Sequence, residues 1–227
     1  LHQHPRHLRR NPAPVMRVDH AVPDLQHRIL AGLAPEIAEV HGLVALMELQ
    51  ASRLAARLDA GGAPVLLRDQ DRQRWDRLLI RRGLQALQRA EQLGGSLGPY
   101  ALQAAIAACH SRAEQFAATD WARIAALYDA LVQVLPSPVV ELNRAVAVSM
   151  AYGPAAALEI VDRLAASAQL QAYHWLPSVR GDLLQRLGRQ AEARVEFERA
   201  AAMTQNARES ALLLERAGLP PRGTSGI

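Results

Sequence analysis

Short stretches of helical apolar spacing, cut at close intervals by glycine and proline, are the feature that most limits how this chain folds. Between Glu36 and Leu58 the apolar residues fall on one stripe of a helix. Turns follow at residues 59–64, at Gly94-Gly95 and at residues 136–138, where Gly or Pro ends a helix. Ala and Leu, which favour helices, are far more frequent than the strand-forming residues. The sequence therefore predicts an all-α fold.

The same spacing predicts a run of further helices after the first. The expected helices cover residues 36–58, 70–93, 100–114, 121–135, 139–151, 154–166, 176–187, 190–204 and 207–217. We expect residues 1–23 to form a disordered or non-native tail, 24–95 a helical domain, 96–217 a repeat domain and 218–227 a loose end. The missing initiating Met predicts that the sequence is a fragment of a longer protein.

Charge and cysteine content exclude several kinds of protein. The net charge is +4, and residues 1–28 alone contribute +3, so the helical body is nearly neutral. The most basic local run, residues 68–89, is either a solvated helix face or a surface for phosphates. A single cysteine, Cys109, excludes an intrachain disulfide and a cysteine-based metal site, and we expect it to be an inert core residue. With no membrane-spanning stretch and no signal peptide, a cytoplasmic protein is expected.

Small and large residues recur at a fixed interval in the C-terminal half. Four pairs are 36 residues apart: Ala145 and Gly181, Ala157 and Ala193, Val161 and Phe197, Leu164 and Ala200. Small residues at helix crossings, with a larger side chain filling the gap between units, are typical of tetratricopeptide repeats. The sequence therefore predicts antiparallel helix pairs stacked as a tetratricopeptide-like right-handed solenoid, although hairpins in Ala-rich chains can imitate this spacing by chance.

The densest polar cluster precedes the second expected helix. It contains Asp69, Asp71, Arg72, Trp75 and Asp76. The paired carboxylates suggest metal binding or acid–base chemistry, but no His or Glu lies at suitable local spacing and the nearby arginines neutralise them. Helix capping and ion pairing around an anchoring Trp is the simpler interpretation, and a contact patch for a partner protein is the functional one.

Two other segments are candidate contact sites. Asn143 and Arg144 lie on the first helix of a repeat unit, which lines the groove of tetratricopeptide arrays. Either they contact a partner in this groove, or Asn143 is merely solvated or makes a hydrogen bond between helices. Residues 173–175, Tyr-His-Trp, suggest either base stacking or a packed linker between units, and the linker is the simpler interpretation. No phosphate loop, nucleophile elbow or zinc spacing is present, so no catalytic residue, metal or cofactor is expected.

Five stretches together resemble a known family. They are EVHGLVALMELQASRLAAR, LLRDQDRQRWDRLLIRRGLQAL, GPYALQAAIAACHSRA, TDWARIAALYDALVQVLPSPVVELNRAVAVSMAYGPAAALEIVD and YHWLPSVRGDLLQRLGRQAEARVEFERA. In this order they resemble the tetratricopeptide-like C-terminal extension of extracytoplasmic-function type sigma factors of bacterial RNA polymerase. The resemblance covers roughly residues 24–217.

This resemblance implies a role in promoter-specific transcription initiation, with core RNA polymerase and the sigma N-terminal regions as partners. No counterpart of the helices that read the −10 and −35 promoter elements is found here, so promoter DNA would be contacted only through regions missing from the chain. The expected role is that of a regulatory interaction domain and not of an enzyme. The alternative is a free-standing scaffold that binds a peptide or a regulatory protein in its groove.

Overall fold

The computed structural model describes residues 29–62 and 65–219, and this part of the chain is helical without a β-strand. Most of the predicted tail and loose end, residues 1–23 and 220–227, lie outside the described residues. None of the helices in the described ranges has the length and apolar content needed to cross a bilayer. The prediction of an all-α fold is thus confirmed for the described residues.

The first three labelled helices are α2 (Ala38–Ala51), α3 (Arg77–Gln92) and α4 (Pro99–Arg112). Two predicted helices were too long. The first ends at Ala51 and is followed by a 3-10 turn, η1 (Leu54–Ala56). The second begins only at Arg77, because residues before it form two 3-10 turns, η2 (Leu67–Asp69) and η3 (Arg72–Arg74).

Asp76 explains the late start of α3. Its carboxylate accepts hydrogen bonds from the amides of Leu78 and Leu79, at 2.8 and 3.1 Å. An N-cap residue has extended backbone angles, so the helix begins after it and not before it. Asp71 does the same for η3 by accepting from the amide of Gln73 at 2.9 Å.

The remaining helices were predicted to within a few residues. They are α5 (Trp121–Val134), α6 (Pro138–Tyr152), α7 (Pro154–Leu164), α8 (Trp175–Arg186), α9 (Gln190–Met203) and α10 (Ala207–Arg216). Two further 3-10 turns, η4 (Phe116–Ala118) and η5 (Ala168–Leu170), precede α5 and α8. Gly153 and Gly188 join helices with φ angles of +97° and +77°, a conformation that favours glycine.

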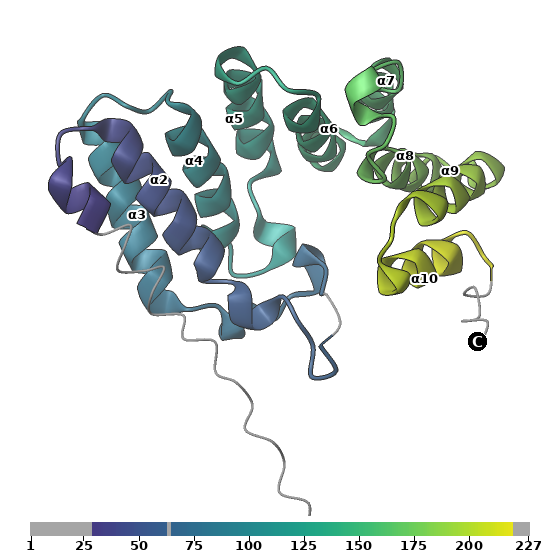
Figure 1. Cartoon of the computed structure of the whole chain (residues 1–227), viewed down its shortest axis with the longest axis horizontal. Helices are drawn as coiled ribbons and strands as arrows, with labels where there is room; N and C mark the ends of the chain where they lie inside the picture. Colours follow the sequence, from purple (N-terminus) through teal and green to yellow (C-terminus); the bar gives the residue numbers. More distant parts are fainter. Residues whose placement is uncertain (1–28, 63–64, 220–227) are drawn as a thin grey trace, which may run out of the picture.

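Each helix from α5 onward packs mainly against its neighbours in sequence. The helices α2, α3 and α4 pack against one another, and α5 to α10 then follow as a chain of neighbouring contacts. Figure 1 shows them along a curved row, with α2–α4 at one end and α8–α10 at the other. The loop around residues 57–62 and helix α10 both lie on the inner side of this curve (Figure 1).

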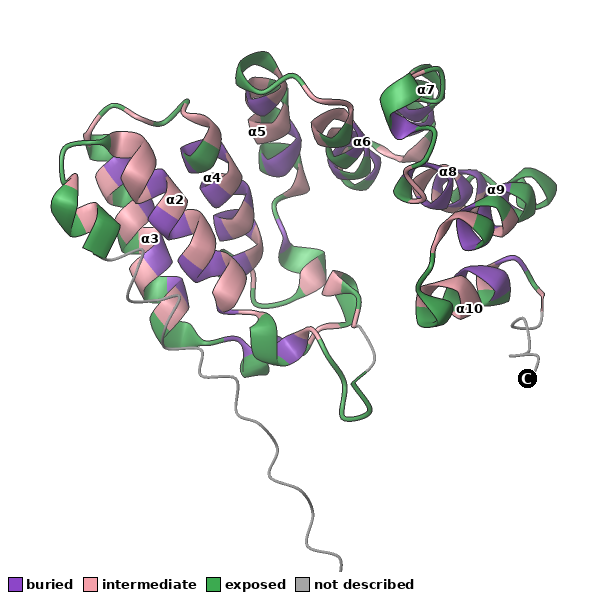
Figure 2. Ribbon diagram, viewed as in Figure 1, coloured by how far each residue is buried: buried purple, intermediate pink, exposed green. Residues whose placement is uncertain are grey.

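Two hydrophobic cores run along the row, and α4 contributes to both. Ala104 and Ala108 belong to the core of α2 and α3, whereas Leu102 and Ile106 belong to the core that continues to α10. Burial is accordingly concentrated on the faces that neighbouring helices turn toward each other (Figure 2). The helix α4 therefore contributes buried side chains to both cores and lies between them in the row.

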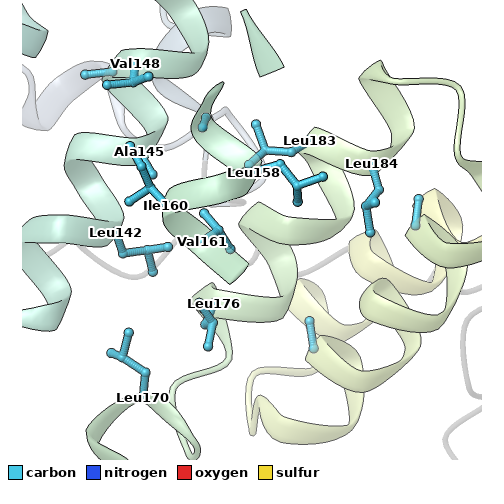
Figure 3. Close-up of a cluster of buried hydrophobic side chains, with 14 of the residues drawn as sticks. Leu142, Ala145, Val148, Leu158, Ile160, Val161, Leu170, Leu176, Leu183 and Leu184 are labelled. Carbon is cyan, nitrogen blue, oxygen red and sulfur yellow. The ribbon is translucent and has the colours of Figure 1, made fainter. Parts of the chain in front are cut away.

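The residues proposed for repeat packing are all buried. They are Ala145, Ala157, Gly181, Ala193, Phe197 and Ala200. Ala145 lies with Leu142, Val148 and residues of α7 and α8 in one apolar cluster (Figure 3). The small side chains thus occupy the interior, where close approach of helices requires them.

Candidate functional site

The predicted polar cluster at residues 69–76 lies in the segment that connects α2 to α3. Trp75 is 3% exposed, and Arg72 is buried beside it with its guanidinium carbon 4.7 Å from the ring centre. Arg72 Nη1 donates hydrogen bonds to the carbonyls of His110 and Ala113, the second at 2.8 Å. These carbonyls end α4, where a helix leaves acceptors unsatisfied and favours a positive charge. Arg72 and Trp75 therefore fasten this segment onto α4.

The three carboxylates of the cluster have different structural roles. Asp71 and Asp76 cap η3 and α3, as described above. Asp69 is exposed and lies 3.4 Å from Arg68. Capping and ion pairing thus account for the three carboxylates, as the simpler interpretation predicted. An open polar depression of about 560 Å³ lies alongside, lined by Asp71, Arg72 and residues of the α4–α5 connection.

Several arginines lie close together next to this depression and affect one another's pKa values. Burial, together with the charges of Arg57 and Arg72, lowers the pKa of Arg53 to about 10. Burial and the charges of Arg53 and Arg72 lower the pKa of His110 to about 4. The Nδ1 atom of His110 and the Nε1 atom of Trp75 are buried without a hydrogen-bond partner among the described residues. His110 is therefore neutral at pH 7 and packs edge-on against Trp121, with ring centres 5.2 Å apart.

Asn143 and Arg144, the other predicted contact residues, differ in their surroundings. Asn143 is exposed on α6. Arg144 donates to Asp129 of α5 at 2.5 Å and to Glu141 at 3.3 Å, so it ties α6 to the preceding helix. Asn143 shares its face of α6 with three exposed apolar side chains at helical spacing, Val139, Val146 and Met150.

The structure reveals a recurrence that our sequence analysis missed. Arg144, Arg180 and Arg216 are 36 residues apart and lie on α6, α8 and α10. Arg180 donates to Asp162 of α7 and to Glu196 of α9, both at 2.8 Å, and Arg216 donates to Asp182 of α8 at 2.5 Å. Each arginine thus binds a carboxylate of an earlier helix. Each also precedes a buried small residue, Ala145, Gly181 or Ala217, and this dipeptide is visible in the sequence.

A second cavity, of about 600 Å³, lies where α8 and α10 meet the segment before η3. Its walls are mainly apolar and include Leu66, Trp175 and Leu212, which are 41%, 42% and 44% exposed. Trp175 is therefore not part of a packed linker, whereas its neighbour Tyr173 does pack against the main core. The cavity combines segments more than a hundred residues apart, so no local sequence pattern indicates it.

Polar groups surround this cavity. Arg208 Nη1 donates to the carbonyl of Gly62 at 2.7 Å and so joins α10 to the inner loop. Glu209 accepts from the Thr204 hydroxyl at 2.8 Å, and its Oε2 atom lies 3.4 Å from Nε2 of His174. That His174 nitrogen is buried and has no well-aligned hydrogen bond among the described residues. The cavity thus has apolar walls and a charged rim.

The described ranges offer neither a cluster of metal-ligating side chains nor an exposed cysteine. No group of three or more His, Cys, Asp or Glu side chains is placed to hold a metal ion within residues 29–62 and 65–219. Cys109 is buried in the core, as expected, and burial raises the pKa of its thiol. A buried thiol with a raised pKa is a poor nucleophile.

Comparison with known proteins gives two matches. Residues 16–91 match the model of a family of unknown function, DUF6596. A protein of Rhizobium meliloti (strain 1021), described as uncharacterized, is 50% identical over 186 residues, which are 82% of this chain and 43% of that protein. The chain therefore spans less than half the length of this relative. The comparison with solved structures found no match.

Proposed function

We propose that this chain is the C-terminal interaction domain of an extracytoplasmic-function type sigma factor. It folds as a tetratricopeptide-like right-handed solenoid and supports promoter-specific initiation by contacting the sigma N-terminal regions and core RNA polymerase. Promoter DNA is read by those N-terminal regions. The proposal also places the protein in the cytoplasm, where the polymerase acts.

The observation that carries the proposal is the 36-residue recurrence of an ion-paired arginine followed by a buried small residue. It supports a repeat in which α6, α8 and α10 are the first helices of successive units. Repeats of this kind stack because one unit alone cannot bury its apolar face, and the stack presents an extended surface for contact. This supports a function that consists of holding other macromolecules.

Two further observations support the sigma-factor assignment. The five stretches that resemble the family fall on α2 to α9 in the family's order. The Rhizobium meliloti relative has more than half of its length outside the match, which leaves room there for separate polymerase-binding and promoter-reading regions.

The test uses that relative as the host. In its full-length form, the segment matched by this chain is replaced by the corresponding residues of this chain. The hybrid is mixed with purified core RNA polymerase, and run-off transcription from the promoter that the relative recognises is measured. We expect the hybrid to restore transcription that deletion of the segment abolishes. A relative that neither binds polymerase nor initiates transcription would overturn the assignment.

The alternative is a free-standing scaffold that binds a peptide or regulatory protein in its groove. The exposed apolar face of α6, with Asn143 among Val139, Val146 and Met150, favours it. The two functions differ in what the chain requires. A scaffold needs neither polymerase nor sigma regions for its function, whereas the proposed domain supports transcription only as part of the initiation complex.

A further inference from the structure

We propose that the cavity between α8, α10 and Leu66 is a docking site for a protein segment that carries a large aliphatic side chain flanked by acidic residues. The proposal rests on the proposed function in so far as that segment belongs to a partner in transcription initiation. The cavity itself is defined by contacts within this chain alone.

Its walls favour an apolar occupant. Leu66, Trp175 and Leu212 come from three separate segments, and each is more than 40% exposed at the same cavity. Covering such surface with an apolar side chain removes it from water and is favourable. A volume of about 600 Å³ lies within the roughly 300–1,000 Å³ typical of ligand sites, so the cavity accepts a few side chains and not a whole domain.

The charges at the rim favour acidic residues beside that anchor. Arg208 donates one hydrogen bond to the Gly62 carbonyl and forms no ion pair among the described residues. Arg68 is ion-paired only with Asp69, its neighbour in sequence. The rim carboxylate of Glu209, by contrast, is already held by Thr204 and faces His174. Glu215 is the one other acid that lines the cavity. Arg216 also lines the cavity but is held by Asp182. Arg208 and Arg68 are therefore the rim arginines that no carboxylate of another helix holds, and guanidinium groups bind carboxylates well.

The shape of the walls favours a protein segment over a nucleic acid. Single-stranded nucleic acids bind to platforms of several aromatic rings with a basic groove. Here Trp175 shares the cavity lining with the aliphatic Leu66 and Leu212, which match an aliphatic side chain better than a base. Nucleic acid binding is accordingly an outcome that the experiment must separate from peptide binding.

The experiment measures binding of fluorescent synthetic peptides to the full chain by anisotropy. One peptide carries a Leu-Leu pair flanked by Glu residues, a second replaces each Glu by Lys, and a third replaces the Leu pair by Ser. We expect the first to bind and the other two to bind at least about tenfold more weakly. Equal binding of the three peptides, or displacement of the first by a single-stranded oligonucleotide, would overturn the proposal.

Variants locate the binding. Leu212→Asp places a charge in the apolar wall and should weaken the Glu-flanked peptide at least about tenfold. The matched control is Leu97→Asp, because Leu97 is 68% exposed and does not line the cavity. The double variant Arg68→Glu with Arg208→Glu should reverse the preference, so that the Lys-flanked peptide binds better. Arg81→Glu, on the exposed side of α3, is its control.

A reversed preference is informative even if the double variant is less stable, since a partly unfolded protein gains no affinity for a basic peptide. An unreversed preference, or equal losses in the control variants, would reject the site. The outcomes also separate the two proposals. Peptide binding with no transcription by the hybrid refutes the sigma assignment alone, and transcription without peptide binding refutes the docking site alone.

Discussion

Gly181 of α8 lies directly against the ring of Phe197 on α9. A Cβ atom built on Gly181 would be 2.7 Å from Cε1 and 2.9 Å from Cδ1 of Phe197. The ring is fully buried, and the guanidinium of Arg216 covers it with its carbon 4.3 Å from the ring centre. The glycine therefore allows α8 to approach α9 closely, and any larger side chain at this position would meet a fully buried ring.

Gly181→Leu should consequently destabilise the protein through overpacking, by about 1–3 kcal/mol. The measurement is the free energy of unfolding from urea denaturation followed by circular dichroism. Gly32→Leu is the control, because nothing lies within 4 Å of a Cβ atom at Gly32. An unchanged unfolding midpoint for Gly181→Leu would contradict the close packing of α8 and α9.

Asp69 and Asp76 belong to the same predicted contact cluster, but only one of them stabilises a helix. Asp76→Ala removes both capping bonds to α3 and should cost about 1 kcal/mol of folding free energy. Asp69→Ala removes an exposed pair with Arg68 and should change the stability by less than about 0.5 kcal/mol. Denaturation curves of the two variants measure the difference, and equal costs would contradict the assigned capping role.

The helices from α5 onward could be predicted from the sequence because their starts carry strong local signals. Asp120 caps α5 by accepting from the amide of Arg123, and Pro138 and Pro154 occupy the first positions of α6 and α7. The segment before α3 was mispredicted because its apolar spacing continues smoothly through Trp75. Two aspartates, Asp71 and Asp76, interrupt the helix there by capping separate turns.

The candidate sites divide in the same way. Capping was the simpler interpretation of the cluster that contains Asp71 and Asp76, although both residues were placed inside one expected helix. The cavity at Trp175 could not be predicted, because Leu66 and Leu212 come from segments far apart in the sequence and meet it only in the folded chain. The burial of Arg72 likewise depends on carbonyls at the end of α4, about 40 residues away in sequence. The 36-residue recurrence of Arg144, Arg180 and Arg216, by contrast, could have been found from the sequence alone.

Arg72→Lys should destabilise the protein although it conserves the charge. A lysine ammonium cannot stack on Trp75 while it donates to the carbonyls of His110 and Ala113. Loss of these charge-assisted bonds in a buried site should cost about 1.5–3 kcal/mol. Arg77→Lys, on an exposed residue of α3, is the matched control and should be near neutral. Thermal melting of both variants tests whether the guanidinium fastens this segment.

The chain by itself should show no sequence-specific affinity for promoter DNA. Its resemblance is to an extension and not to promoter-reading helices, and its helical body is nearly neutral, so the phosphate contacts that drive DNA binding are few. Electrophoretic mobility shifts with promoter and scrambled duplexes at low and physiological salt provide the measurement. A sequence-specific shift that persists at physiological salt would refute this expectation.

His110 should make the stability depend on pH between its two pKa values. The imidazole pKa is 6.5 in the unfolded chain and is lowered to about 4 in the fold by burial, Arg53 and Arg72. Below pH 6.5 the unfolded state binds a proton that the folded state does not, so stability present at pH 7 is lost as the pH falls toward 4. The contribution is on the order of 3 kcal/mol in total. Unfolding free energies of the protein and of His110→Gln, measured from pH 7 to 4, isolate it. A difference between the two that stays constant over this range would show that His110 is protonated as readily in the fold as in the unfolded chain.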